Sequence, residues 1–157
     1  MEQDKKEFPT IYFRIEEIRK ISHFENNFLD LGFKKTDLKK FNFEILLGLG
    51  IDGDEGNISQ IIKTRFFIKV GVDEKDLFGL ESLHKYKIKD FKSLFGSKSC
   101  DKYQIPDNLM TTFLGISISG TRSMLAVLNT VPEYSKIFLP PINPLKLLET
   151  IKTKLNS

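Results

Sequence analysis

The chain has 157 residues, with 24 Lys and Arg against 21 Asp and Glu, a formal net charge of +3, and 40% hydrophobic residues. This length fits one domain and this apolar content is enough for a core, so the composition excludes a globally disordered chain. One Cys and two His exclude an internal disulfide and a zinc site built from Cys and His.

The beginning of the chain is mostly polar and lacks the apolar stretch of a signal peptide. No window approaches the roughly 20 consecutive apolar residues that a membrane helix needs. We therefore expect a polar tail over residues 1–10, one domain over residues 11–157, and a cytoplasmic protein without a membrane partner. The mild charge gives no reason to expect a nucleic-acid partner.

The first predicted element is a strand. Apolar and polar residues alternate from Ile11 to Ile15, which is typical of a half-buried strand. The segment 19–40 is irregular and carries several Phe and Leu, so we expect a long connection there.

A hairpin follows. Apolar residues occupy alternate positions over 41–51 and again over 58–72, and the glycine-bearing turn 52–57 joins the two runs. The polar run 73–76 is typical of a second turn. Weaker alternation over 80–95 predicts a fourth strand.

Helices close the chain. After Pro106, apolar residues recur in steps of three and four until Pro132, which predicts a long helix. Its two apolar stripes indicate that the sheet covers one side and a second subunit the other. Asn143 is a predicted cap for a short last helix beginning at Pro144. The residues expected at the interface between subunits are Phe113, Ile116, Gly120, Met124 and Val127.

The predicted order defines the fold class. Strands first and helices last are typical of an α+β fold, with helices on one face of an antiparallel sheet. We therefore expect a four-stranded antiparallel sheet followed by a long helix and a short C-terminal helix.

The residue types offer no metal or catalytic site. Asp52, Asp54 and Asn57 superficially resemble a calcium loop, but Lys63 stands where such a loop needs a bidentate Glu. A hairpin turn explains them better.

Cys100 with His23 or His84 could form a nucleophile and base, but no local signature of catalysis surrounds the cysteine. We expect no cofactor and no enzymatic activity.

The chain has more apolar residues than a small monomer is expected to bury. They lie in the connection after the first strand and on one face of the last helix. Such a surface is typical of an oligomer interface, or of a groove that binds apolar polypeptide segments. The candidate polypeptide-binding residues are Phe24, Phe28, Leu31, Phe33, Leu147, Leu148 and Ile151.

Three segments resemble one known family. The run 118–125 (Ile-Ser-Gly-Thr-Arg-Ser-Met-Leu) resembles the long helix of SecB-like export chaperones, and the run 138–145 (Phe-Leu-Pro-Pro-Ile-Asn-Pro-Leu) is similar to that family's link into its last helix. Phe13-x-Ile15, followed by residues 22–25 (Ser-His-Phe-Glu), resembles the family's first strand and its exit into a crossover loop. In order and spacing the resemblance covers roughly Ile11 to Ile151.

The resemblance implies a homotetramer built as a dimer of dimers. It also implies ATP-independent holding of non-native polypeptides in apolar grooves, with the crossover loop and helices as walls and protein export as one use of this activity. Members that dock on the translocase motor are acidic, whereas this chain has Lys85, Lys87 and Lys89 in its predicted fourth strand, so motor docking stays open. The alternatives are a dedicated SecB-like chaperone for one client, such as an antitoxin, and a small-ligand enzyme formed by a helix-on-sheet dimer.

Overall fold

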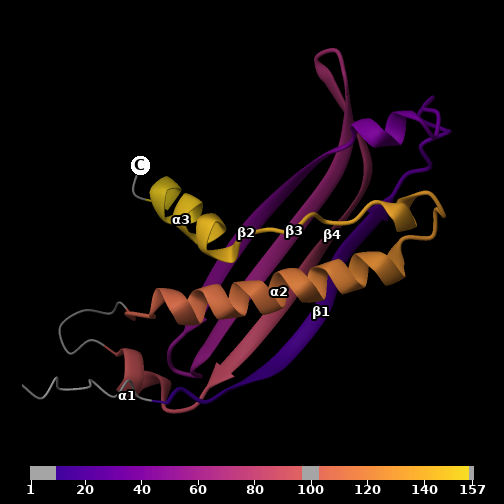
Figure 1. Cartoon of the computed structure of the whole chain (residues 1–157). Helices are drawn as coiled ribbons and strands as arrows, with labels where there is room; N and C mark the ends of the chain where they lie inside the picture. The colour runs from indigo at the N-terminus through magenta and orange to yellow at the C-terminus, as the bar shows by residue number, and fades with distance from the viewer. Residues whose placement is uncertain (1–9, 97–102, 156–157) are drawn as a thin grey trace, which may run out of the picture.

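A computed structural model describes residues 10–96 and 103–155, with side chains as far as Thr150. Four antiparallel strands form one sheet in the order β1-β4-β3-β2, and α2 lies across one face of it (Figure 1). We call this the helix face and the opposite one the far face. The predicted α+β class, with a long and a short helix after a four-stranded sheet, is confirmed.

The strands are β1 (Phe13–Glu25), β2 (Asn42–Asp52), β3 (Asn57–Val70) and β4 (Asp73–Ile88). The helices are α1 (Phe91–Phe95), α2 (Asp107–Leu128) and α3 (Pro144–Leu155), with 3-10 turns η1 (Asp37–Lys40) and η2 (Tyr134–Lys136). The predicted hairpin is confirmed, because β2 and β3 pair without irregularity along the whole of β2. The expected polar tail falls on residues 1–9, which lie outside the described residues, and on Thr10.

The first strand is longer than predicted. The segment that was expected to be irregular from residue 19 onward continues β1 as far as Glu25. The pairing of β1 with β4 shifts between Ile15 and Glu17 and again between Lys20 and Ser22. Each irregularity inserts a residue, so the period of two that identifies a strand is lost from the sequence.

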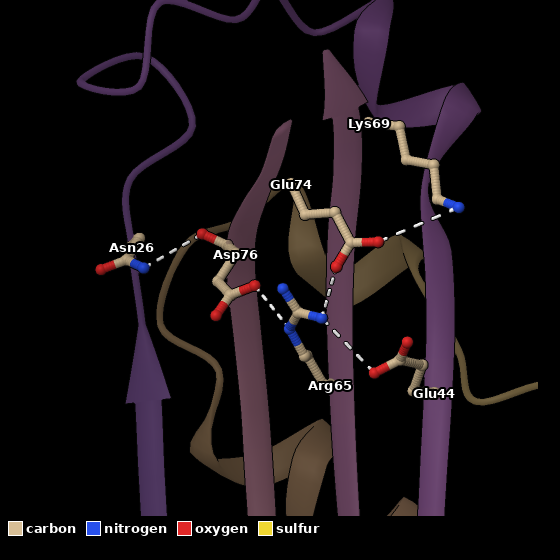
Figure 2. A network of polar contacts seen from close by, with 6 residues as sticks. All are labelled: Asn26, Glu44, Arg65, Lys69, Glu74 and Asp76. Carbon is tan, nitrogen blue, oxygen red and sulfur yellow. Dashed lines mark hydrogen bonds and ion pairs between the residues drawn. The ribbon is translucent and has the colours of Figure 1, made fainter. Parts of the chain in front are cut away.

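The second turn was also predicted in the wrong place. Gly71, with φ of +63°, and Val72 form a two-residue loop, and the acidic run that follows belongs to β4. Its acidic residues stay in the strand because Arg65 of β3 binds them (Figure 2). The Arg65 side chain donates to Asp76 Oδ1 at 2.6 Å and to Glu74 Oε2 at 2.7 Å, and it also reaches Glu44 Oε2 of β2 at 3.4 Å.

The fourth strand ends earlier than predicted. β4 stops at Ile88, and Asp90 takes a left-handed conformation with φ of +57°. The residues after it form the short helix α1, whose Phe91 and Phe95 are buried. The weak alternation over 80–95 therefore combines the end of a strand with one helical turn.

The core lies between the sheet and α2. Tyr86 of β4 stacks on Phe113 of α2, with ring centroids 4.3 Å apart. The start of α3 confirms the predicted cap, because Asn143 Oδ1 accepts hydrogen bonds from the backbone N–H groups of Leu145 at 3.0 Å and Lys146 at 3.3 Å. α3 then packs against α2.

Candidate functional site

Both edge strands expose apolar side chains on the helix face. A helix is about 10 Å wide, whereas four strands span roughly 14 Å, so one helix cannot cover the whole sheet. Residues of β1 that pair with buried residues of β4, and residues of β2 that pair with buried residues of β3, have their side chains on the helix face. The β1 strip consists of Phe13, Ile15 and Ile18, the β2 strip of Phe43, Leu49 and Ile51, and each of these side chains is 37 to 48% exposed.

β2 also has an unprotected free edge. The strand contains no Lys, Arg or Pro, and its charges are Glu44 and Asp52 near its two ends. Leu46, which projects on the far face, is 59% exposed. Edge strands are usually protected by lysine, proline or bulges. The backbone of β2 is therefore open to pairing with an added strand.

Two glycines leave the far side of β2 bare. A Cβ atom added at Gly48 would lie 3.5 Å from Ile61 Cβ, and one at Gly50 would lie 3.7 Å from Ser59 Cβ. Both distances are ordinary van der Waals contacts, so packing within the chain does not require glycine at either position.

β1 has a different edge. Charged residues lie between its apolar residues, and the two pairing irregularities interrupt the strand. Glu17 binds Arg19 at 2.7 Å, and Glu16 binds Lys85 of β4 at 3.5 Å. Lys85 is therefore not a free surface cation.

The structure separates the candidate residues of the crossover segment. Phe24 stays 38% exposed on the far face, where its ring lies over Gly79. Phe28 is only 1% exposed and lies near Tyr134, and Leu31 and Phe33 are half-buried against the same core. In this conformation Phe24 is the most accessible of the four.

The candidate residues of α3 also differ from one another. Leu148 is buried and Leu147 is half-buried. Ile151 lies in the last turns of α3, where side chains are outside the described residues. Leu145, which sequence reasoning did not select, is exposed at the start of the same helix.

The predicted interface residues on α2 range from core to surface. Phe113 is fully buried within one chain, and a Cβ atom at Gly120 would lie 2.8 Å from His84 Cε1. Ile116 and Met124 are half-buried. Val127 is 82% exposed, so it is the one most available to a second subunit.

A buried polar seam between α2 and the sheet is a feature that sequence reasoning missed. Thr121 Oγ1 lies 2.8 Å from Ser82 Oγ and 3.2 Å from His84 Nε2, and Ser117 Oγ lies 2.7 Å from Tyr86 Oη. Burial lowers the pKa of His84 to about 4, so the imidazole is neutral at pH 7. The alternation of Ser82, His84 and Tyr86 along β4 was the available signal.

The arrangement of these groups gives no support to catalysis. His84 is buried, His23 Nε2 lies 3.2 Å from Asn129 Oδ1, and Cys100 lies outside the described residues. Among the described residues, no group of three or more His, Cys, Asp or Glu side chains could hold a metal ion.

A cavity of about 740 Å³ lies beside the turn between β2 and β3. Charged side chains in its wall pair with each other, as Lys92 Nζ does with Asp54 Oδ1 at 2.7 Å. The turn itself confirms the hairpin interpretation of the acidic residues, because Asp52 Oδ1 accepts a hydrogen bond from the backbone N–H of Glu55 at 3.0 Å.

Within the described part of the chain, no helix is both long and apolar enough to span a membrane.

Comparisons with known proteins include structural likenesses, two of which are described below. No protein-family model matches the chain, and no curated protein matches it. A SecB-like chaperone of Mycobacterium tuberculosis, solved in complex with a ChAD peptide from the HigA1 antitoxin, is 13% identical with a TM-score of 0.45, over 83% of this chain and 87% of that one. A protein of unknown function from Streptococcus agalactiae is 17% identical with a TM-score of 0.30, over 76% of this chain and 92% of that one. Both TM-scores are below 0.5, and neither likeness assigns the chain to a family.

Proposed function

We propose that the chain is a cytoplasmic, ATP-independent chaperone that holds non-native polypeptides. The observation that carries the proposal is β2, an edge strand with an unpaired backbone edge and exposed apolar side chains on both faces. A non-native polypeptide offers the matching chemistry, because it exposes apolar side chains and unpaired backbone groups together.

Two kinds of contact act together at this strand. An extended segment gains backbone hydrogen bonds along the free edge of β2, while its alternate side chains pack against the β2 strip. Neither contact depends on the exact sequence of the bound segment, as is expected of a protein that binds many different segments. The candidate residues Phe24, Leu31, Phe33 and those of α3 remain part of this proposal as further apolar contacts.

The sequence resemblance to SecB-like chaperones extends the proposal to the assembly of several copies. Several copies would present several β2 strands, so that one long client is held by more than one weak site. We propose a homotetramer on this basis, with the exposed Val127 of α2 among its contacts. No step of this mechanism uses a cofactor or a chemical reaction, so we propose a binding protein and not an enzyme.

A holding assay tests the function. A chemically denatured test protein is diluted into buffer with increasing amounts of the chain, and aggregation is followed by light scattering. We expect suppression at a near-stoichiometric ratio, unchanged by ATP. Failure of the wild-type chain to suppress aggregation overturns the proposal.

Lysine substitutions test the site. We expect Leu46→Lys and Leu49→Lys, on the two faces of β2, each to raise the amount of chain needed by several-fold, because lysine on an edge opposes strand addition. Val72→Lys is the matched control, since Val72 is fully exposed in the loop between β3 and β4. Equal losses in all three variants would mean that β2 is not the site. Suppression limited to one natural client would narrow the function to a dedicated chaperone.

A further inference from the structure

The polar seam interrupts the apolar packing between α2 and the sheet. Ser82, His84 and Thr121 are fully buried there, and the two hydroxyl oxygens lie 3.0 and 3.2 Å from His84 Nε2. Among the described residues, the other ring nitrogen, Nδ1, has no hydrogen-bond partner. We propose that α2 separates from the sheet at this seam when His84 takes up a proton.

The imidazole ring lies directly against the backbone of α2. A Cβ atom added at Gly120 would lie 2.8 Å from His84 Cε1 and 3.4 Å from His84 Nδ1. The glycine therefore lets the helix cover the unpartnered nitrogen. A proton on Nδ1 creates a buried N–H donor without an acceptor, and such a donor is costly until water reaches it.

The sheet supplies no counter-charge to a protonated ring. Ile18 of β1 and Gln60 of β3 pair with His84 on either side. Lys20 lies two positions further along the same face of β1, and its charge has the same sign as a protonated imidazole. Tyr86 of β4 is buried, and burial raises the pKa of its hydroxyl, so this group is also neutral.

The helix supplies none either. The charged residues of α2 are Asp107 and Arg122. Asp107 lies in the first turn, about 20 Å along the helix axis from Thr121. Arg122 donates its hydrogen bonds to backbone carbonyls of the link before α3. A buried charge without a partner favours any movement that hydrates it.

Movement of α2 hydrates the ring without breaking the sheet. β4 is paired on both sides, whereas α2 forms a separate layer over it (Figure 1). Lifting the helix costs side-chain contacts but no hydrogen bonds between strands. It uncovers buried residues such as Ile58 and Ile62. This would enlarge the apolar surface that the proposed function uses, but the separation itself does not rest on that function.

Hydrogen exchange at pH 7 and pH 5, corrected for intrinsic exchange rates, measures the separation. Burial lowers the pKa of His84 to about 4, against 6.5 in water, so the opening constant of the α2 amides should rise about twentyfold. Amides of β3 around Gln60 should stay more protected than those of α2 around Gly120 at both pH values. An unchanged opening constant, or one common rate for β3 and α2, overturns the inference.

The two histidines of the chain give a matched pair of variants. His84→Gln should lose most of the twentyfold rise, because glutamine takes up no proton in this range. His23→Gln should keep it, because His23 Nε2 lies 3.2 Å from Asn129 Oδ1, which can accept a hydrogen bond from a protonated ring. Equal rises in the two variants overturn the assignment to His84.

A reversible cross-link tests which contact opens. Ser82 Oγ and Thr121 Oγ1 lie 2.8 Å apart, which is close to the bond length of a disulfide, about 2.05 Å. In a Cys100→Ser background, the oxidised form of a Ser82→Cys, Thr121→Cys chain should show no rise in the opening constant of α2 at pH 5. The reduced form of the same chain should show one. A rise of the same size in both forms overturns the inference.

Discussion

β1 and β2 are the two edges of one sheet, and each exposes an apolar strip on the helix face. They differ in what lies between the apolar residues. On β1 these are charges of both signs. On β2 they are one glutamate, one leucine and two glycines (Glu44, Leu46, Gly48 and Gly50). The side chains of the two strips are similarly exposed, so the two edges differ mainly in the residues between the apolar positions.

The largest expected effect concerns the β1 side, where His84 lies beneath α2 and pairs with Ile18. Its pKa is about 4 in the folded chain and about 6.5 when unfolded, so the unfolded chain binds more protons between these values. The contribution of neutral His84 to the free energy of unfolding is thus fully present above pH 6.5 and is lost as the pH falls towards 4. We expect this group to contribute a loss of about 2 kcal/mol between pH 7 and pH 5.

The physical cause is burial of the ring, which disfavours its charged form. His84 Nδ1 has no hydrogen-bond partner among the described residues, so a protonated ring would leave a buried donor unpaired. Urea unfolding at pH 7, 6 and 5 measures the loss, and His84→Gln should lose less over the same range. Parallel losses in the two proteins would contradict the assignment to His84.

A smaller effect is expected on the β2 side from Arg65→Met. The change removes the ion pairs that tie Glu44 of β2 to Glu74 and Asp76 of β4 (Figure 2). The cluster is partly exposed, so we expect a loss of only about 1 kcal/mol in the free energy of unfolding. Hydrogen exchange should speed up around Glu44 more than around Glu17. Uniform acceleration at both edges would show that Arg65 does not act locally on β2.

The smallest expected effect has the opposite sign. Gly48→Ala adds a Cβ atom at an ordinary contact distance and restricts the unfolded chain, so we expect stabilisation by about 0.5 kcal/mol. Gly71→Ala is the control, because its φ of +63° strains any other residue and should cost about 1 kcal/mol. Thermal unfolding measures both. A destabilising Gly48→Ala would show that β2 needs glycine for its own packing.

The sequence predicted the elements whose signals are local. The alternation in β2 and β3 and the Asn143-Pro144 cap depend on neighbouring residues, and both are confirmed. The second half of β1 could not be predicted, because its irregularities are set by pairing with β4, more than 50 residues away. The start of β4 was missed for a related reason, since Asp76 becomes a strand residue through Arg65 of another strand.

The candidate site was predicted less well than the fold. The sequence shows that Phe28 and Phe113 are apolar but not that each is buried within one chain. It also gave no means of separating Leu46 and Leu49 from core residues, because a strand becomes an edge only through the order of the whole sheet.

That order has a consequence during synthesis. β1 leaves the ribosome first, yet its only partner within the sheet is β4, whose paired residues follow between 53 and 75 positions later, from Glu25 with Phe78 to Phe13 with Ile88. At about 5 to 20 residues per second, the nascent β1 waits roughly 3 to 15 s with its isoleucines uncovered. During that interval the chain is itself a segment with unpaired backbone groups and uncovered apolar side chains, of the kind that β2 of a finished copy is proposed to hold.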